Sequence, residues 1–195
     1  MNKTKVAVCT GSGRHGGLGE AILRRLGQEG YRLVVTDIHG TGDEHLCSES
    51  EMASVAEELR SVGTEVMCHP CDVRSPDSVN QLFEAVASTF GRVDVLVNNA
   101  GIGFVMKHTR EVSPEEWQLV IDVTLSGVFL CTQAAASYME KAGSGGRIIN
   151  KEDITMLEHK MDGEFAAIRS EMASEFNDVR GEIARLDQKM DHLEE

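Results

Sequence analysis

The first 150 residues alternate between short apolar runs and longer segments with helical spacing. Five apolar or β-branched runs, each bounded by Gly, Pro, Asn or Asp, are predicted to be strands: Lys5 to Thr10, Arg32 to Asp37, Thr64 to His69, Val93 to Asn98 and Arg147 to Asn150. Four segments with apolar residues three and four apart are predicted helices: Gly19 to Glu29, Glu51 to Val62, Ser75 to Phe90 and Pro114 to Lys141, the last with a bend. This alternation predicts an open α/β fold with a parallel sheet.

The pattern changes after Gly143-Ser144-Gly145-Gly146. Residues 151–195 contain no Pro, Cys, Tyr or Trp, and hold six Lys or Arg against thirteen Asp or Glu. Their apolar residues recur at steps of three and four from Ile154 to Leu193, a narrow seam typical of helix-on-helix pairing. We therefore expect two domains, 1–150 and 151–195. The second is a long amphipathic helix or coiled coil that makes a homo-oligomer through residues 154–193, or folds back onto the first domain.

Net charge, apolar segments and cysteine spacing argue against several classes of function. A net charge of -13 argues against binding to nucleic acid or an anionic membrane surface. The N-terminus lacks the apolar run of a signal peptide, and no segment is expected to reach the roughly 18 apolar residues of a membrane span, so a cytoplasmic protein is expected. The five cysteines are irregularly spaced, and Cys68-His69-Pro70-Cys71 is interpreted as a strand end, because no second such pair completes a metal site.

A glycine-rich loop follows the first predicted strand. It runs from Thr10-Gly11-Ser12-Gly13 to Gly17-Leu18-Gly19, at the start of the first helix. Glycine permits positive φ and close backbone approach, while free N–H groups at a helix start attract a pyrophosphate. Asp37 ends the second strand about 20 residues later, where a ribose-binding acid belongs. Strand, loop, helix and acid together predict a dinucleotide site.

Several motifs in order resemble the short-chain dehydrogenase/reductase family. The glycine-rich loop is followed by Cys71-Asp72-Val73, by Asn98-Asn99-Ala100-Gly101, by a helix with Val128 to Ala135 and by Gly146 to Asn150. The resemblance covers about three quarters of the chain. It implies a Rossmann-like open parallel sheet of about five strands in the order 3-2-1-4-5, and an NAD(P)-binding module of an oxidoreductase. The implied cofactor-binding residues are Thr10, Gly11, Ser12, Gly13, Gly17, Leu18, Gly19, Asp37, Asp72, Val73, Asn98, Ala100 and Gly101.

The loop and the cofactor type leave alternatives open. Matching Gly17-Leu18-Gly19 to the end of the family's loop leaves five residues after Gly11 instead of three, whereas Gly11-x-Gly13-x-x-Gly16 fits the general dinucleotide fingerprint without insertion. Asp37 favours NAD because it accepts from both ribose hydroxyls and repels a 2′-phosphate, while Arg14 would attract one, so NADP is possible.

The family's catalytic set does not map onto this sequence. By resemblance it requires a Ser, an Asn and a Tyr followed four residues later by Lys. Tyr31 and Tyr138, the two tyrosines, are followed at that spacing by Val35 and Ala142, and Thr124 stands at the Asn position. We therefore predict no catalytic residues and a non-catalytic, oligomeric cofactor-binding module. The alternatives are an active oxidoreductase with a non-standard or partner-supplied acid/base, and a coiled-coil scaffold with a passenger Rossmann half.

Overall fold

The chain divides into two units, Met1–Lys151 and Glu152–Glu195. The computed structural model describes residues 4–39, 47–102, 107–143 and 145–150, all within the first unit. The helix predicted over 151–195 and the association predicted through residues 154–193 lie outside the described residues. All helices and strands named below therefore belong to the first unit.

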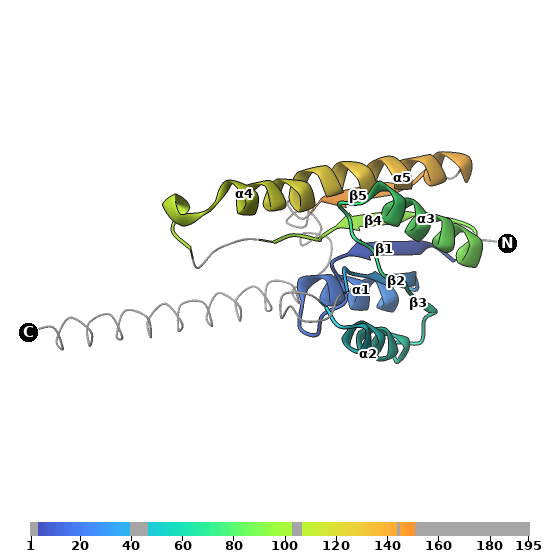
Figure 1. The fold of residues 1–195 in the computed structure, drawn as a ribbon. Coiled ribbons are helices and arrows are strands. Elements are labelled where there is room, and N and C mark those ends of the chain that lie inside the picture. The colour runs from blue at the N-terminus through green and yellow to red at the C-terminus, as the bar shows by residue number, and fades with distance from the viewer. Residues whose placement is uncertain (1–3, 40–46, 103–106, 144, 151–195) are drawn as a thin grey trace, which may run out of the picture. The chain divides into compact units, whose positions relative to one another are not determined.

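A five-stranded parallel sheet in the order β3-β2-β1-β4-β5 forms the centre of this unit (Figure 1). The α/β class predicted from the apolar pattern and the Rossmann-like strand order implied by the family resemblance are confirmed. The strands β3 and β4 are shorter than predicted, because β3 begins at Val66 and ends at Cys68, and β4 begins at Val95. The strands are β1 (Val6–Thr10), β2 (Arg32–Thr36), β3 (Val66–Cys68), β4 (Val95–Asn98) and β5 (Arg147–Asn150).

Helices cover both faces of the sheet, α1 (Leu18–Gln28) and α2 (Glu49–Arg60) on one side and α3 (Pro76–Phe90) and α5 (Gly127–Lys141) on the other (Figure 1). Side chains alternate along a strand, so successive residues of β1 serve opposite layers. The core beneath α3 and α5 combines strand residues with apolar residues of both helices, including Val6, Val8, Leu96, Leu82, Phe83, Cys131 and Ala135.

The long predicted helix is built from α4 (Pro114–Ile121), a π-helical turn (Asp122–Ser126) and α5. Ser113 begins α4 with a capping box, in which its side chain accepts from the backbone N–H of Glu116 and its own N–H donates to the Glu116 carboxylate. The π-helical turn interrupts the α-helical pattern, and the predicted bend stays a prediction. Such turns widen the helix by one residue and allow the two halves to follow different directions.

The same helix corrects one expectation. Pro114–Lys141 is, by length and composition alone, apolar enough to cross a membrane, so the expectation that no segment reaches this length was wrong. The apolar character of α5 has a second origin in the fold, because Cys131, Ala135 and Met139 are buried in the core. Its opposite side exposes Phe129. Length and composition therefore do not distinguish a spanning helix from one that covers a sheet.

Candidate functional site

Most of the predicted site residues follow the carboxyl ends of neighbouring parallel strands. Thr10 ends β1, Asp37 follows β2, and Asn98 ends β4, with β1 between the other two strands. The chain leaving β1 forms the glycine-rich loop and enters α1, whose first residue is Leu18. In open α/β sheets, ligands bind at this edge, beside the N-terminus of the first helix.

Gly11 and Gly19 allow the two ends of the glycine-rich loop to touch. Gly11 has φ +66°, a left-handed conformation that glycine adopts without strain. A Cβ on Gly19 would lie 2.7 Å from the carbonyl oxygen of Gly11, so only glycine permits the first turn of α1 to approach so closely. Gly16 has positive φ but no neighbour within 4 Å of the place of a Cβ. Gly11 therefore forms the tight turn, and Gly19 forms the close contact between helix and loop. These two roles agree with the alignment in which Gly17-Leu18-Gly19 ends the family's loop.

Asn99 holds the beginning of this loop, and it was not among the predicted site residues. Its Nδ2 donates to the carbonyl oxygens of Thr10, at 3.0 Å, and Gly11, at 2.8 Å. The backbone N–H groups of Asn99 and Ala100 donate to Thr10 Oγ1, each at 3.1 Å. The position of Asn99 directly after a buried strand was the available signal, because successive residues there point to opposite faces.

Asn98, by contrast, faces away from the loop. Its Nδ2 donates to Thr132 Oγ1 in α5 and to Asn150 Oδ1 in β5, both at 3.1 Å. The two asparagines of the motif therefore serve opposite sides of the sheet. Asn99 shapes the glycine-rich loop, and Asn98 ties β4 to β5 and α5.

Ser12, Gly13 and Asp37 join the loop to the end of β2. Ser12 N donates to the carbonyl oxygen of Thr36 at 3.0 Å, and Thr36 N donates to Ser12 Oγ at 3.2 Å. The Asp37 carboxylate accepts from Gly13 N at 3.0 Å and from Ile38 N at 2.9 Å. Desolvation raises the pKa of Asp37, while these two backbone donors and the charge of Arg14 oppose the rise. The Arg14 charge therefore acts on the acid expected to select the cofactor.

The N-cap residue of α1 is a glycine, Gly17, which has no side chain to form a capping hydrogen bond. Leu18 begins the helix. Glu20 Oε2 accepts from Gly16 N at 2.8 Å, just outside the helix. Both Gly17 and Leu18 are half-buried. The first N–H groups of α1 thus belong to residues without a capping side chain, as an anion-binding loop requires.

Asp72 and Val73 have partners of their own. Arg74 donates to the Asp72 carboxylate through Nε, at 2.8 Å, and Nη2, at 2.7 Å, and this pairing lowers the pKa of Asp72. The Val73 side chain is buried against the start of α5, where a Cβ on Gly127 would lie 2.7 Å from Val73 Cγ2. Val73 can therefore meet an adenine only through its backbone.

The two tyrosines lie within packing layers. The Tyr138 ring stacks on Phe83 of α3 with centroids 6.3 Å apart, and Lys141 Nζ lies 5.2 Å from the Tyr138 ring centroid. Lys5 Nζ lies 6.0 Å from the Tyr31 ring centroid. Thr124 faces Gly101 but uses its hydroxyl within the helix, donating to the carbonyl oxygen of Val120 at 2.6 Å. None of these contacts brings a tyrosine to the glycine-rich loop.

The Cys68-x-x-Cys71 pair has the properties of packed thiols. Burial raises the pKa of Cys68, and it raises the pKa of Cys71 to about 11. Redox and metal chemistry need the thiolate, which such an environment disfavours. The interpretation of this segment as a strand end is consistent with both values.

Comparison with known proteins identifies the family. The sequence matches the family described as short chain dehydrogenase over residues 5–154. The chain belongs to this family. It is 36% identical over 151 residues to an indene-carboxyl-CoA reductase of Mycobacterium tuberculosis, covering 77% of this chain and 53% of the relative. It is 35% identical over 157 residues to a 3-oxoacyl-(acyl-carrier-protein) reductase of Staphylococcus aureus, covering 79% and 58%. This short-chain dehydrogenase chain thus spans about half the length of the curated relatives it matches.

Solved structures of similar fold include both cofactor types. A short-chain type dehydrogenase/reductase from Mycobacterium marinum has a TM-score of 0.67 at 31% identity, covering 76% of this chain and 55% of that one. A metagenomic short-chain oxidoreductase in complex with NADP has a TM-score of 0.63 at 35% identity, covering 76% and 61%. An NAD⁺-bound xylitol dehydrogenase has a TM-score of 0.63 at 27% identity, covering 76% and 52%. The family assignment therefore supports NAD(P) and leaves the choice between NAD and NADP to the residues of this chain.

Proposed function

We propose that residues 1–150 form a dinucleotide-binding module in which the glycine-rich loop holds the pyrophosphate and Asp37 holds the adenosine ribose. The observation that carries this proposal is the contact of Gly19 with Gly11. It brings the N-terminus of α1 against the end of β1, and no capping hydrogen bond from the side chain of a described residue occupies the helix start. Ala100 and Gly101, at the end of β4, would lie beside the nicotinamide half of the cofactor.

We further propose that NAD(H) is preferred over NADP(H). A carboxylate can accept from both hydroxyls of an adenosine ribose, and it repels a 2′-phosphate. The backbone donors from Gly13 and Ile38 hold the Asp37 carboxylate at the end of β2, where that ribose would lie. Arg14 acts in the opposite sense, since its positive charge would attract a 2′-phosphate.

The third part of the proposal is that this chain binds the cofactor without turning over substrate. Hydride transfer needs a proton donor of tuned pKa beside the carbonyl oxygen. The chain has two tyrosines, neither followed by Lys at the fourth position, and Tyr138 stacks against α3. The hydroxyl of Thr124, at the family's Asn position, is bonded within its own helix.

Binding is tested by titrating NADH into the full chain, followed by cofactor fluorescence and by the melting temperature. We expect saturable binding that Asp37→Ala weakens about tenfold, because hydrogen bonds to a charged group are lost. Asp77→Ala, at an exposed site in the first turn of α3, is the matched control and should bind like wild type. Absence of NADH binding at millimolar concentration would overturn the proposal.

Turnover is tested separately, with the same preparation and a panel of secondary alcohols and ketones. We expect no steady oxidation or reduction of the nicotinamide above background. Steady turnover that Asp37→Ala reduces would contradict the non-catalytic part and leave the binding part intact.

We also propose that the seam over residues 154–193 makes the protein a homo-oligomer, on the strength of its three- and four-residue spacing. Polar substitution of Ile168 and Ile183, which lie in this seam, should reduce the mass measured by sedimentation equilibrium to that of one chain. A monomeric wild-type chain would contradict this part.

A further inference from the structure

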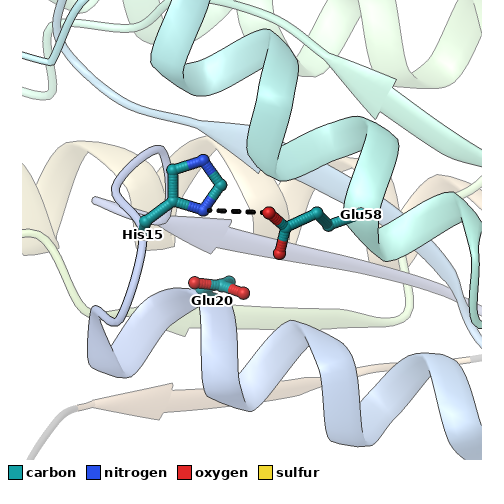
Figure 2. A group of neighbouring side chains, drawn as sticks. All are labelled: His15, Glu20 and Glu58. Carbon is teal, nitrogen blue, oxygen red and sulfur yellow. Dashed lines mark ion pairs between the residues drawn. The ribbon is translucent and has the colours of Figure 1, made fainter.

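One side-chain cluster beside the glycine-rich loop is not used by the proposed dinucleotide site. Figure 2 shows His15 from the loop, Glu20 from α1 and Glu58 from α2, with their polar ends directed toward one another. One ligand atom from each residue lies within 4.8 Å of the other two. The loop, α1 and α2 thus bring one imidazole nitrogen and two carboxylate oxygens close together. Zinc and similar divalent cations bind these donor types in proteins.

The spacing of two of the donors suits a metal ion. His15 Nδ1 lies 3.5 Å from Glu58 Oε1. Two ligands about 2.0–2.1 Å from a tetrahedral zinc ion lie about 3.3 Å apart. The third ligand, Glu20, is buried, whereas the side chains of His15 and Glu58 are exposed. An ion from solvent therefore reaches the cluster from the side of His15 and Glu58.

Hydrogen bonds already orient each donor. Ser54 Oγ lies 3.1 Å from His15 Nε2, the ring nitrogen opposite the donor. Arg24 Nη2 donates to Glu20 Oε1 at 2.5 Å and to Glu58 Oε2 at 3.2 Å, and Glu58 Oε1 is left facing His15. Metal-bound imidazoles and carboxylates normally have such outer partners, which fix their orientation. Each carboxylate oxygen has two lone pairs, so the bonds from Arg24 and from Gly16 N do not use up the binding capacity of the two carboxylates.

The local charge also favours a divalent cation. Besides Glu20 and Glu58, Glu51 lies at this site, because its Oε1 accepts from His15 N at 3.4 Å. Three carboxylates thus surround His15, and Arg24 donates to two of them. The net charge of -13 on the whole chain adds a long-range attraction for cations.

We propose that His15, Glu20 and Glu58 bind a divalent transition-metal ion of the zinc class, with water completing its coordination. The ion would fasten the glycine-rich loop to α2 through His15 and Glu58. The site goes beyond the proposed dinucleotide binding and does not depend on it. Its position next to Gly16 and Gly17 makes the conformation of the loop the property that the ion would stabilise.

The test is a calorimetric titration of the metal-free full chain with Zn²⁺, in the absence of any dinucleotide. We expect His15→Ala and Glu58→Gln each to weaken one binding event by about tenfold or more. His108→Ala and Glu57→Gln are the matched controls: His108 is an exposed histidine outside the cluster, and Glu57 neighbours Glu58 but pairs with Arg60. Both controls should bind like wild type.

A second measurement separates this site from the thiols. The Co²⁺-loaded wild type should show the visible absorption of a nitrogen- and oxygen-bound ion, without sulfur-to-cobalt charge transfer, and His15→Ala should lose that absorption. Unchanged Zn²⁺ affinity in both His15→Ala and Glu58→Gln would overturn the proposal, as would equal loss in the controls. Both substituted side chains are exposed, so circular dichroism should show folded variants. Failure of NADH binding in the separate titration would leave this result unaffected.

Discussion

Asn99 donates its side-chain amide to the carbonyl oxygen of Gly11 at 2.8 Å, from the end of β4 to the first residue after β1. The donor comes 88 residues after the acceptor in the sequence. The same Nδ2 lies where a side chain on Gly19 would be, 2.8 Å from the place of its Cβ. The shape of the glycine-rich loop thus depends on β4 as much as on its own glycines.

Asn99→Ala should destabilise the fold by about 1–3 kcal/mol, because it leaves the carbonyl oxygens of Thr10 and Gly11 without their side-chain donor. Urea denaturation measures the change in the free energy of unfolding. Asn80→Ala, at an exposed position of α3, should change it by less than about 0.5 kcal/mol. Equal stability of the two variants would show that the Asn99 bonds contribute nothing.

Gly19→Ala should cost about 1–3 kcal/mol, since its Cβ would lie 2.7 Å from Gly11 O and 2.8 Å from Ser12 Cα. Gly101→Ala is the matched control, because the nearest atoms of the described residues would lie 3.8 Å from its Cβ. Thermal unfolding of both variants checks the difference. If Gly19→Ala were as stable as Gly101→Ala, the close approach of α1 to the loop would be wrong.

Asp37→Ser should raise the NADPH-to-NADH affinity ratio about tenfold or more, because it removes the carboxylate that repels a 2′-phosphate and leaves Arg14 in place. Parallel titrations with the two reduced cofactors give the ratio. Arg14→Gln is the opposing variant and should lower it. A ratio unchanged in both variants would place the adenosine ribose elsewhere.

The Asp72 and Arg74 pair should make stability depend on pH. The hydrogen bonds from Arg74 hold the pKa of Asp72 below its ordinary value, so the pair stabilises the folded protein above the unfolded pKa of about 3.9. This contribution is lost as pH falls through the lower folded pKa. The wild type should therefore melt above Asp72→Asn at pH 6, and the gap should shrink toward pH 3.

Both side chains of that pair are partly exposed, so solvent screening limits its contribution to less than about 1 kcal/mol. The gap in melting temperature should also shrink in 1 M salt, where exposed ion pairs are screened. A gap that widened toward low pH would contradict the assignment of the pair.

Predictions from the chain pattern succeeded where one local property decided the outcome. The β-branched run of Val6 to Thr10 and the capping residues Ser75 and Ser113 mark a strand and two helix starts with little help from elsewhere. The strand predicted over Thr64 to His69 was too long at both ends, because β3 covers only Val66–Cys68. Periodicity along the long helix did not reveal the π-helical turn at Asp122–Ser126.

The strands, most of the helices and the glycine-rich loop could be predicted from the amino-acid sequence, because apolar periodicity and glycine positions are local properties of the chain. The strand order is not local, and it was predicted through the resemblance of several motifs to one family. Which asparagine serves the loop became known only from the folded arrangement: Asn99 bonds Gly11 while Asn98 turns to Thr132. The fold also brings His15 and Glu58 together, from the loop and from α2. Such pairings depend on how distant elements pack, and spacing along the chain does not encode them.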